Sequence, residues 1–202
     1  QEACTLGVTL ERIDEDFKVV DGLYEDEAFR ISVCPSMLGQ HQLHNAALAI
    51  RAMGHVVSLQ EELVKKAINK ASLPFRFERI TDSLYFDGAH NPASVDMLIQ
   101  LIKQYWPNES VQFVVGMLAD KDVKQVLKLL EQVSDDFVFV DFENTRAMKA
   151  EQLMLYSHAK VKTIEHDAVN YLIERAKGTE KTVVTGSLYL LASLREAVLH
   201  QL

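Results

Sequence analysis

The amino-acid sequence predicts an α/β fold with a mostly parallel sheet that is covered by helices on both faces. From about residue 77 onward, short runs rich in β-branched and aromatic residues alternate with longer runs whose apolar residues recur at helical spacing. The runs at residues 111–115, 137–140 and 182–184 are apolar at most positions. Strands with two apolar faces are typical of a sheet between two helical layers, so we expect a doubly wound arrangement.

This alternation predicts an element for each part of the region. We expect strands at residues 77–80, 84–86, 111–117, 137–140, 161–164 and 182–184, and helices at residues 94–106, 123–133, 150–159, 168–176 and 188–199. In a sheet of this kind, ligands bind beyond the carboxyl ends of the strands. Residues that follow a predicted strand are therefore the first candidates for a functional site.

The first 72 residues have a different pattern, in which loosely alternating strands precede two helices. We expect strands at residues 5–13, 17–20 and 29–33, and acidic turns at residues 14–16 and 24–27. A helix at residues 42–53 should end at Gly54. A second helix should be capped by Ser58, with Glu61 as its partner in a capping box.

The chain has 202 residues, which is more than one average domain of about 150 residues. A small sheet closed by two helices does not bury itself, and Pro74 marks a boundary after it. We therefore expect residues 1–72 to be the carboxyl-terminal end of a larger domain and residues 73–202 to form a second domain. The chain starts at Gln1 without an initiator methionine, which favours the same interpretation.

The composition argues against several classes of protein. Hydrophobic residues make up 48% and charged residues 25% of the chain, which is the balance of a folded globular protein. The formal net charge is -8 and no basic block is visible, so we expect no nucleic-acid partner. No apolar run approaches the roughly 20 residues of a membrane-spanning helix, so we expect no membrane span. Cys4 and Cys34 are far apart in sequence, which favours reduced thiols in a cytoplasmic protein.

Two common types of site are absent from the sequence. The glycines form neither G-x-x-x-x-G-K-[ST] nor G-x-G-x-x-G, so this chain does not hold a triphosphate by a phosphate loop of its own. The cysteines and histidines show no paired spacing of metal ligands, since His41 and His44 lack a following acidic or histidine partner. We therefore predict no metal site within the chain.

The segment at residues 87–92 carries the most polar groups at a predicted strand end. Asp87 could accept a hydrogen bond from a hydroxyl group or hold the water of a cation. His90 and Asn91 could donate to an anion near the start of the next helix. A structural interpretation stays open, in which Asn91 caps the helix and Asp87 ends the strand.

Other candidate residues also have a functional and a structural interpretation. Gln42 and Asn45 share a helix face and could bind the edge of a ring such as adenine, or they could be a cap and a solvated side chain. Arg76 lies between two phenylalanines and could be a stiffened phosphate ligand or a surface arginine. Asp122 and Ser187 follow strands at the same sheet edge and could each be an N-cap, although Ser187 could also bind a carboxylate.

Taken together and in this order, five segments resemble motifs of one enzyme family. The segments resemble the carboxyl-terminal part of folylpolyglutamate synthase, an enzyme that is often bifunctional with dihydrofolate synthase. This enzyme family belongs to the ATP-dependent amide ligases, which also include the Mur enzymes. The matching segments are G-x-H-Q-x-x-N-A at residues 39–46, R-F-E near a proline at residues 76–78, D-G-A-H-N-P at residues 87–92, D-K-D at residues 120–122 and T-G-S-L-Y at residues 185–189. Phe75 stands where the family usually has glycine before the arginine.

The resemblance implies a Rossmann-like carboxyl-terminal domain after a small α+β remnant of a central ATPase-type domain. It implies a ligase that adds L-glutamate to folate or dihydropteroate through an acyl phosphate. ATP is the implied cofactor, and the Mg²⁺ ligands and the phosphate loop would lie in an amino-terminal part. By motif, Asn45 would contact adenine, Arg76 the phosphates and Asp87 the nucleotide, while His90 would be catalytic and Ser187 would bind glutamate.

The implied partners are therefore ATP, folate or dihydropteroate, and L-glutamate, with no nucleic acid and no membrane. We expect a cytoplasmic monomer, and we expect the chain to be inactive by itself. The alternative from another class of protein is a self-contained α/β module that binds a partner without catalysis. A phosphate loop encoded upstream of this chain would decide for the ligase.

Overall fold

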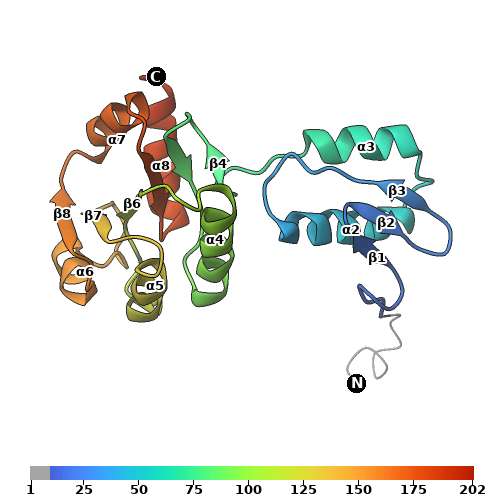
Figure 1. Ribbon diagram of the computed structural model, residues 1–202, viewed down its shortest axis with the longest axis horizontal. Coiled ribbons are helices and arrows are strands. Elements are labelled where there is room, and N and C mark those ends of the chain that lie inside the picture. The colour runs from blue at the N-terminus through green and yellow to red at the C-terminus, as the bar shows by residue number, and fades with distance from the viewer. Residues whose placement is uncertain (1–9) are drawn as a thin grey trace. The chain divides into compact units, whose positions relative to one another are not determined.

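The computed structural model describes residues 10–202, which divide into two compact units between Ser72 and Leu73 (Figure 1). The strand predicted at residues 5–13 lies for the most part outside the described residues. Within residues 10–202, no helix has both the length and the apolar character that crossing a membrane requires.

The first unit contains a small antiparallel sheet. Strand β1 (Lys18–Val20) pairs with β2 (Leu23–Glu25), which in turn pairs with β3 (Arg30–Ser32). The sequence predicted β1 and β3. It also predicted an acidic turn at residues 24–27, which was wrong at residues 24 and 25, because these belong to β2. The side chain of Tyr24 is fully buried in the core of this unit. This burial outweighs the turn preference of the acidic residues around it.

Two helices complete the first unit. Helix α2 (Gln40–Gly54) begins two residues before its predicted start, and α3 (Glu61–Lys70) follows. The capping box predicted for Ser58 was wrong, because α3 has Gln60 as its N-cap and this N-cap makes no side-chain capping hydrogen bond. Ser58 therefore lies too far from the helix to cap it. The buried core of the unit consists of Phe17, Val19, Tyr24, Ile31, Val33, Ala47 and Ile50.

The second unit is built on a six-stranded sheet. Its strands are β4 (Glu78–Arg79), β5 (Leu84–Phe86), β6 (Val111–Val115), β7 (Asp136–Val140), β8 (Val161–Glu165) and β9 (Lys181–Thr185). Their order in the sheet is β4-β5-β9-β6-β7-β8, and all neighbouring pairs are parallel except β4 and β5. The prediction of a mostly parallel sheet is confirmed.

Helices cover both faces of this sheet, as the sequence predicted (Figure 1). They are α4 (Pro92–Tyr105), α5 (Val123–Leu130), α6 (Ala150–Tyr156), α7 (Ala168–Lys177) and α8 (Leu188–Leu199). Helix α5 packs against both α4 and α6 on one face, and α7 packs against α8 on the other. The sheet is therefore the middle of three layers.

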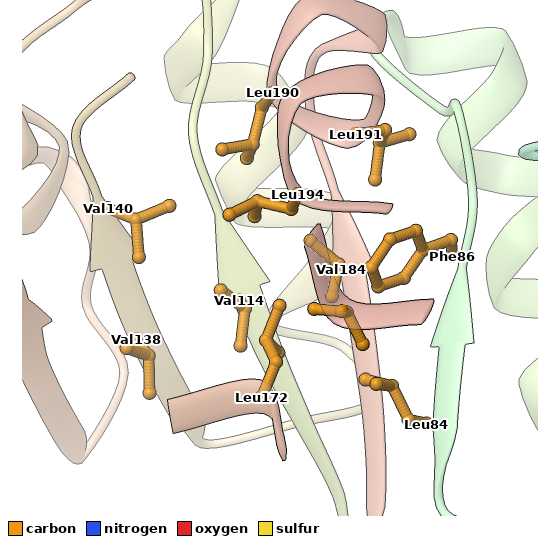
Figure 2. Packing of buried hydrophobic residues seen from close by; sticks show 11 residues of the cluster. Leu84, Phe86, Val114, Val138, Val140, Leu172, Val184, Leu190, Leu191 and Leu194 are labelled. Atoms are coloured by element: carbon orange, nitrogen blue, oxygen red, sulfur yellow. The ribbon is translucent and has the colours of Figure 1, made fainter. Parts of the chain in front are cut away.

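The core between the sheet and the layer of α7 and α8 is made of aliphatic and aromatic side chains (Figure 2). Its buried members are Leu84, Phe86, Val114, Val138, Val140 and Val184 from the strands, with Leu172, Leu190, Leu191, Leu194 and Val198 from the helices. Each fully buried leucine, valine or phenylalanine contributes about 1.5–3 kcal/mol to stability. This packing gives the loops at the strand ends a rigid base.

The order of the strands creates a crevice at one edge of the sheet. Strand β9 comes last in the chain but lies between β5 and β6. The loops after β5 and β6 lead to α4 and α5 on one face, whereas the loop after β9 leads to α8 on the opposite face. Open α/β sheets bind ligands where neighbouring loops leave in opposite directions.

Candidate functional site

Glycines allow the carboxyl ends of β5, β6 and β9 to approach one another closely. Gly186 follows β9 with a φ of 104°, and a Cβ there would lie 2.7 Å from the carbonyl oxygen of Gly116, which follows β6. A Cβ on Gly88, in the loop after β5, would lie 2.7 Å from the Cδ2 atom of Leu188. The N–H group of Gly186 donates to the carbonyl oxygen of Ala89 at 3.0 Å. Larger residues at these glycines would push the loops apart.

A cavity of about 150 Å³ opens among these loops. It is lined by His90, Leu118, Lys121, Arg146, Gly186, Ser187, Leu188 and Tyr189. The lining contains a lysine, an arginine and a histidine, but no aspartate or glutamate. Its volume is well below the roughly 300 Å³ at which pockets for drug-sized ligands begin. The cavity is therefore suited to a small anionic ligand.

His90 lies on the β5 side of the cavity. Its Nδ1 atom is 2.8 Å from the carbonyl oxygen of Gly88, so Nδ1 carries the hydrogen of this bond and Nε2 is left for a ligand. The N–H groups of His90 and Asn91 both donate to the hydroxyl of Ser94, and Asn91 accepts the N–H group of Ser94 in return. Asn91 is thus the N-cap of α4, which confirms its structural interpretation, and the cap holds the backbone of His90 in place.

Ser187 lies between β9 and α8, with only 3% of its surface exposed. Its hydroxyl oxygen accepts the N–H group of Tyr189 at 3.3 Å, which makes Ser187 the N-cap of α8. The hydroxyl group donates to no residue that the structure describes, so its hydrogen is available to a ligand. The first N–H groups of α8 add further donors at the same end of the cavity. The position of Ser187 is therefore compatible with both capping and binding of an anion.

The loops after β6 and β7 are joined by backbone hydrogen bonds. The N–H group of Ala119 donates to the carbonyl oxygen of Arg146 at 2.8 Å, and the N–H group of Met148 donates to that of Met117 at 2.8 Å. An isolated antiparallel bridge links Leu118 to Ala147 between them. This pairing brings Arg146, in the loop after β7, to the cavity among the loops that follow β5, β6 and β9.

The two cations of the cavity come from these paired loops. The guanidinium of Arg146 lies 3.2 Å from the carboxylate of Asp120 and 6.0 Å from the ring centre of Tyr189. Lys121 is half-buried in the loop after β6 and forms no salt bridge with any described residue. The cavity therefore has a positive end that Asp120 neutralises in part.

Asp87 binds the backbone of two neighbouring segments. Its Oδ2 atom accepts the N–H group of Phe77 at 2.8 Å, and its Oδ1 atom accepts the N–H group of Ala89 at 2.9 Å. Burial raises the pKa of the Asp87 carboxyl, while these two N–H groups and the nearby guanidinium of Arg76 act in the opposite direction. The carboxylate thus joins the loop after β5 to the segment that carries Arg76.

The residues on either side of Arg76 have an unusual backbone. Phe75 and Phe77 have φ angles of 64° and 48°, which are left-handed values that aromatic residues rarely adopt. Glu78 accepts the N–H group of Phe75 at 3.1 Å, and the carbonyl oxygen of Phe75 accepts the N–H group of Gly88 at 2.8 Å. The side chain of Arg76 is exposed and makes no hydrogen bond or salt bridge with any described residue. Arg76 is therefore a cation on a constrained loop that has the Asp87 carboxylate nearby but forms no salt bridge with it.

Side-chain packing secures the same segment. The ring of Phe77 packs against Tyr85 and Trp106, with centroids 5.2 Å and 5.1 Å away. The carboxylate of Glu78 accepts hydrogen bonds from Nε and Nη2 of Arg195, the shortest at 2.6 Å. The neighbours of Arg76 are thus fixed to β5, to the C-cap of α4 and to α8.

Asn45 belongs to the first unit, where it is exposed on α2. Its Nδ2 atom donates to the Oε1 atom of Gln42 at 3.1 Å. The two amides therefore share a helix face, as predicted, and bond to each other. The Oδ1 atom of Asn45 accepts no hydrogen bond from a described residue.

The other predicted site residues meet at one sheet edge of the second unit: His90, Ser187, Asp87 and Arg76. His90 and Ser187 line the cavity, and Asp87 and Arg76 lie on adjoining segments. Arg146 was missed by the sequence reasoning, because it belongs to no motif and reaches the cavity through the pairing of two loops. Lys121 was part of the D-K-D motif, but the sequence left its role open.

Metal-binding side chains and cysteines add little to this site. Within residues 10–202, no group of three or more histidine, cysteine, aspartate or glutamate side chains is arranged to hold a metal ion. Cys34 is free and exposed, and Cys4 lies outside the described residues.

Comparison with known proteins relates this chain to one family. The family model described as "Dihydrofolate synthetase, C-terminal domain" matches residues 75–197. A curated relative, the dihydrofolate synthase/folylpolyglutamate synthase of Bacillus subtilis, is 31% identical over 190 residues. The match covers 89% of this chain and 43% of the relative. The chain thus spans less than half the length of that relative.

Solved structures show the same similarity over nearly the whole chain. Escherichia coli FolC in complex with DHPP and ADP matches with a TM-score of 0.85 and 27% identity, over 98% of this chain and 50% of that chain. A bifunctional folylpolyglutamate synthase/dihydrofolate synthase from Yersinia pestis, complexed with AMPPNP and Mn ion, matches with a TM-score of 0.83 and 25% identity. That match covers 97% of this chain and 49% of the other.

Proposed function

The chain belongs to the dihydrofolate synthetase C-terminal domain family, and we propose from this that it is the carboxyl-terminal part of an ATP-dependent ligase that adds L-glutamate to folate or dihydropteroate. In this proposal, residues 1–72 are the end of the central ATPase-type domain and residues 73–202 are the Rossmann-like ligase domain. The chain spans about half the length of the relatives that it matches, so it acts together with an amino-terminal part.

The observation that carries this proposal is the cavity at the crevice of the sheet. Its volume of about 150 Å³ suits a free amino acid better than a nucleotide or a folate. Ser187 and the first turn of α8 offer hydrogen-bond donors to a carboxylate. The lining is cationic, which matches an acidic amino acid. We assign this cavity to L-glutamate.

ATP fits the segment next to this cavity. The guanidinium of Arg76 forms no salt bridge with a described residue and is suited to the phosphates, because a preorganised cation needs little reorganisation when it binds an anion. Asp87 belongs to the same nucleotide site, where its carboxylate holds the loop that carries Arg76. We assign Asn45 to the adenine, since its Oδ1 atom is an acceptor for an amino group.

When bound, ATP supplies the phosphoryl group that activates the folate or dihydropteroate carboxylate as an acyl phosphate. The nitrogen of L-glutamate then forms a bond to the acyl carbon, the bond to the phosphate oxygen breaks, and the amine loses a proton. His90 lines the glutamate cavity with Nε2 free, so we place it beside the reacting groups as the catalytic residue.

The complete enzyme has further components that we propose without assigning them to residues of this chain. The bound metal is Mg²⁺, a common partner of ATP. Because residues 10–202 hold no suitable cluster of ligands, we name no metal ligand in this chain. We propose that the complete protein is a monomer and that it is located in the cytoplasm.

The test is to express the complete reading frame that contains this chain and to measure ADP formation with ATP, a divalent metal, L-glutamate and either dihydropteroate or tetrahydrofolate. We expect ADP formation to require both the amino acid and the pterin substrate. The 202-residue chain by itself should produce no ADP, because it has no phosphate loop. Absence of ADP formation by the complete protein with every substrate combination would favour a non-catalytic binding module.

A further inference from the structure

Arg146 has a partner that a ligand can replace. The side chains of Arg146 and Asp120 form a salt bridge at 3.2 Å while remaining 53% and 48% exposed. Exposed ion pairs contribute little to stability, because water solvates each partner nearly as well. A carboxylate that enters the cavity can therefore take the place of Asp120 at small cost.

The backbone of Arg146 is fixed although its side chain is exposed. Its carbonyl oxygen accepts the N–H group of Ala119, and its own N–H group donates to the side chain of Asn144 at 2.9 Å. The guanidinium also lies over the ring of Tyr189. These contacts limit the orientations of the side chain before a ligand arrives, which reduces the entropy that binding must overcome.

The cavity has donors of two kinds, which come from different segments of the chain. Ser187 and the first turn of α8 provide uncharged donors, and Arg146 and Lys121 come from the paired loops and carry positive charge. A ligand with one carboxylate satisfies one of these groups. A ligand with two carboxylates can bind the uncharged donors with one carboxylate and the cations with the other. No cation then faces an apolar part of the ligand.

We propose that Arg146 is a specificity-determining residue that binds the side-chain carboxylate of an acidic amino acid. The α-carboxylate then binds at Ser187, and Lys121 adds positive charge near the side chain. This inference rests on the proposed function and adds the residue that distinguishes L-glutamate from a neutral analogue such as L-glutamine. Glutamine has the same length as glutamate but cannot neutralise Arg146.

The test is an NMR titration of the 202-residue chain with L-glutamate and with L-glutamine, followed at the backbone amides of Gly186, Ser187 and Leu188. We expect L-glutamate to bind at least about tenfold more tightly, because a site built for one polar group rejects an analogue that leaves it unpaired. Arg146→Gln should remove this preference by weakening the binding of L-glutamate, with the binding of L-glutamine unchanged.

Arg79→Gln is a matched control. Arg79 is also an exposed arginine in an exposed ion pair of the second unit, with Asp82 as its partner. This variant should keep the preference for L-glutamate. Since both arginines are exposed, both variants should fold, and their amide spectra outside the changed loops should match that of the unmodified chain.

Each contrary result has a separate meaning. Equal affinities for the two amino acids in the unmodified chain, or a preference that survives Arg146→Gln, would overturn the role of Arg146. If Ser187→Ala then weakens the binding of L-glutamate, the assignment of the cavity stands and only the Arg146 inference fails. If L-glutamate shifts none of these amides in the unmodified chain, the Arg146 inference and the cavity assignment both fail, whereas the ligase activity is judged by the assay of the complete protein.

Discussion

The carboxylate of Asp87 accepts the backbone N–H group of Phe77 at 2.8 Å, across ten residues of sequence. Phe77 directly follows Arg76 and has a left-handed φ of 48°. The second oxygen of Asp87 accepts the N–H group of Ala89 in the loop after β5. One partly buried carboxylate therefore connects the loop that carries Arg76 to the loop that carries His90.

Asp87→Asn should destabilise the second unit. An asparagine side chain has one acceptor oxygen, so its amide nitrogen would face one of the two N–H groups that Asp87 now binds. We expect the free energy of unfolding to fall by about 1–3 kcal/mol, the cost of a buried group without a partner. Urea unfolding monitored by the fluorescence of Trp106 measures this change.

Asp122→Asn is the control for this prediction. Asp122 is the N-cap of α5 and accepts one N–H group, from Gln125 at 3.3 Å. Asparagine caps a helix about as well as aspartate, so this variant should change stability by less than about 0.5 kcal/mol. Equal effects of the two substitutions would mean that Asp87 acts as an ordinary loop residue.

Arg76→Ala should separate activity from stability. Because the side chain is exposed and forms no salt bridge with a described residue, we expect the free energy of unfolding to change by less than about 0.5 kcal/mol. In the complete protein, the barrier to turnover should rise by about 2–4 kcal/mol, as for the loss of a preorganised charge. Steady-state kinetics and urea unfolding of the same variant test both parts.

The control is Arg79→Ala, which removes a neighbouring exposed arginine and should leave turnover unchanged. Parallel losses of turnover and stability in Arg76→Ala would contradict the assignment of Arg76 to the phosphates.

Gly186→Ala should disrupt the crevice. The added Cβ would lie 2.7 Å from the carbonyl oxygen of Gly116, and the φ of 104° is unfavourable for alanine. We expect a loss of about 2–4 kcal/mol, which combines a strained backbone with overpacking. Gly178→Ala is the control, since its Cβ would meet its nearest backbone atom at 3.4 Å with a negative φ. Thermal unfolding of the two variants compares them, and a stable Gly186→Ala protein would show that the strand ends can separate.

Glu11→Gln should change how the stability of the first unit depends on pH. Hydrogen bonds from Arg51 and His55 lower the pKa of the Glu11 carboxyl from 4.5 to about 2. Between these values the unfolded state binds more protons than the folded state, so the free energy of unfolding rises with pH. The stabilisation from Glu11 is therefore present above pH 4.5 and is lost as the pH falls toward 2. Amide exchange in β1 to β3 at several pH values measures it.

The control for Glu11 is Glu62→Gln, whose carboxylate is 88% exposed and lies 3.7 Å from Lys65. We expect the slope of stability against pH in this range to decrease for Glu11→Gln and to stay unchanged for Glu62→Gln. The same slope in both variants would show that the contacts with Arg51 and His55 do not persist in solution.

The elements of the second unit could be predicted because their signals are local. Alternation of apolar runs is enough to locate β5 and β6, and both begin at their predicted residues. In the first unit, β2 was missed because its residues resemble a turn, and the burial of Tyr24 in a core that several segments share decides its structure. The capping box at Ser58 failed for a related reason, since a capping motif does not determine where a helix begins.

The sequence by itself determined the family resemblance, the α/β class and the residues that follow the strands, including His90 and Ser187. These features depend on residue type and spacing along the chain. The tertiary structure alone decided that β9 lies between β5 and β6, that Asp87 binds the backbone of Phe77, and that Arg146 reaches the cavity. Strand order and loop pairing are contacts between distant segments, and their energies depend on how complete layers pack, which no short pattern in the sequence records.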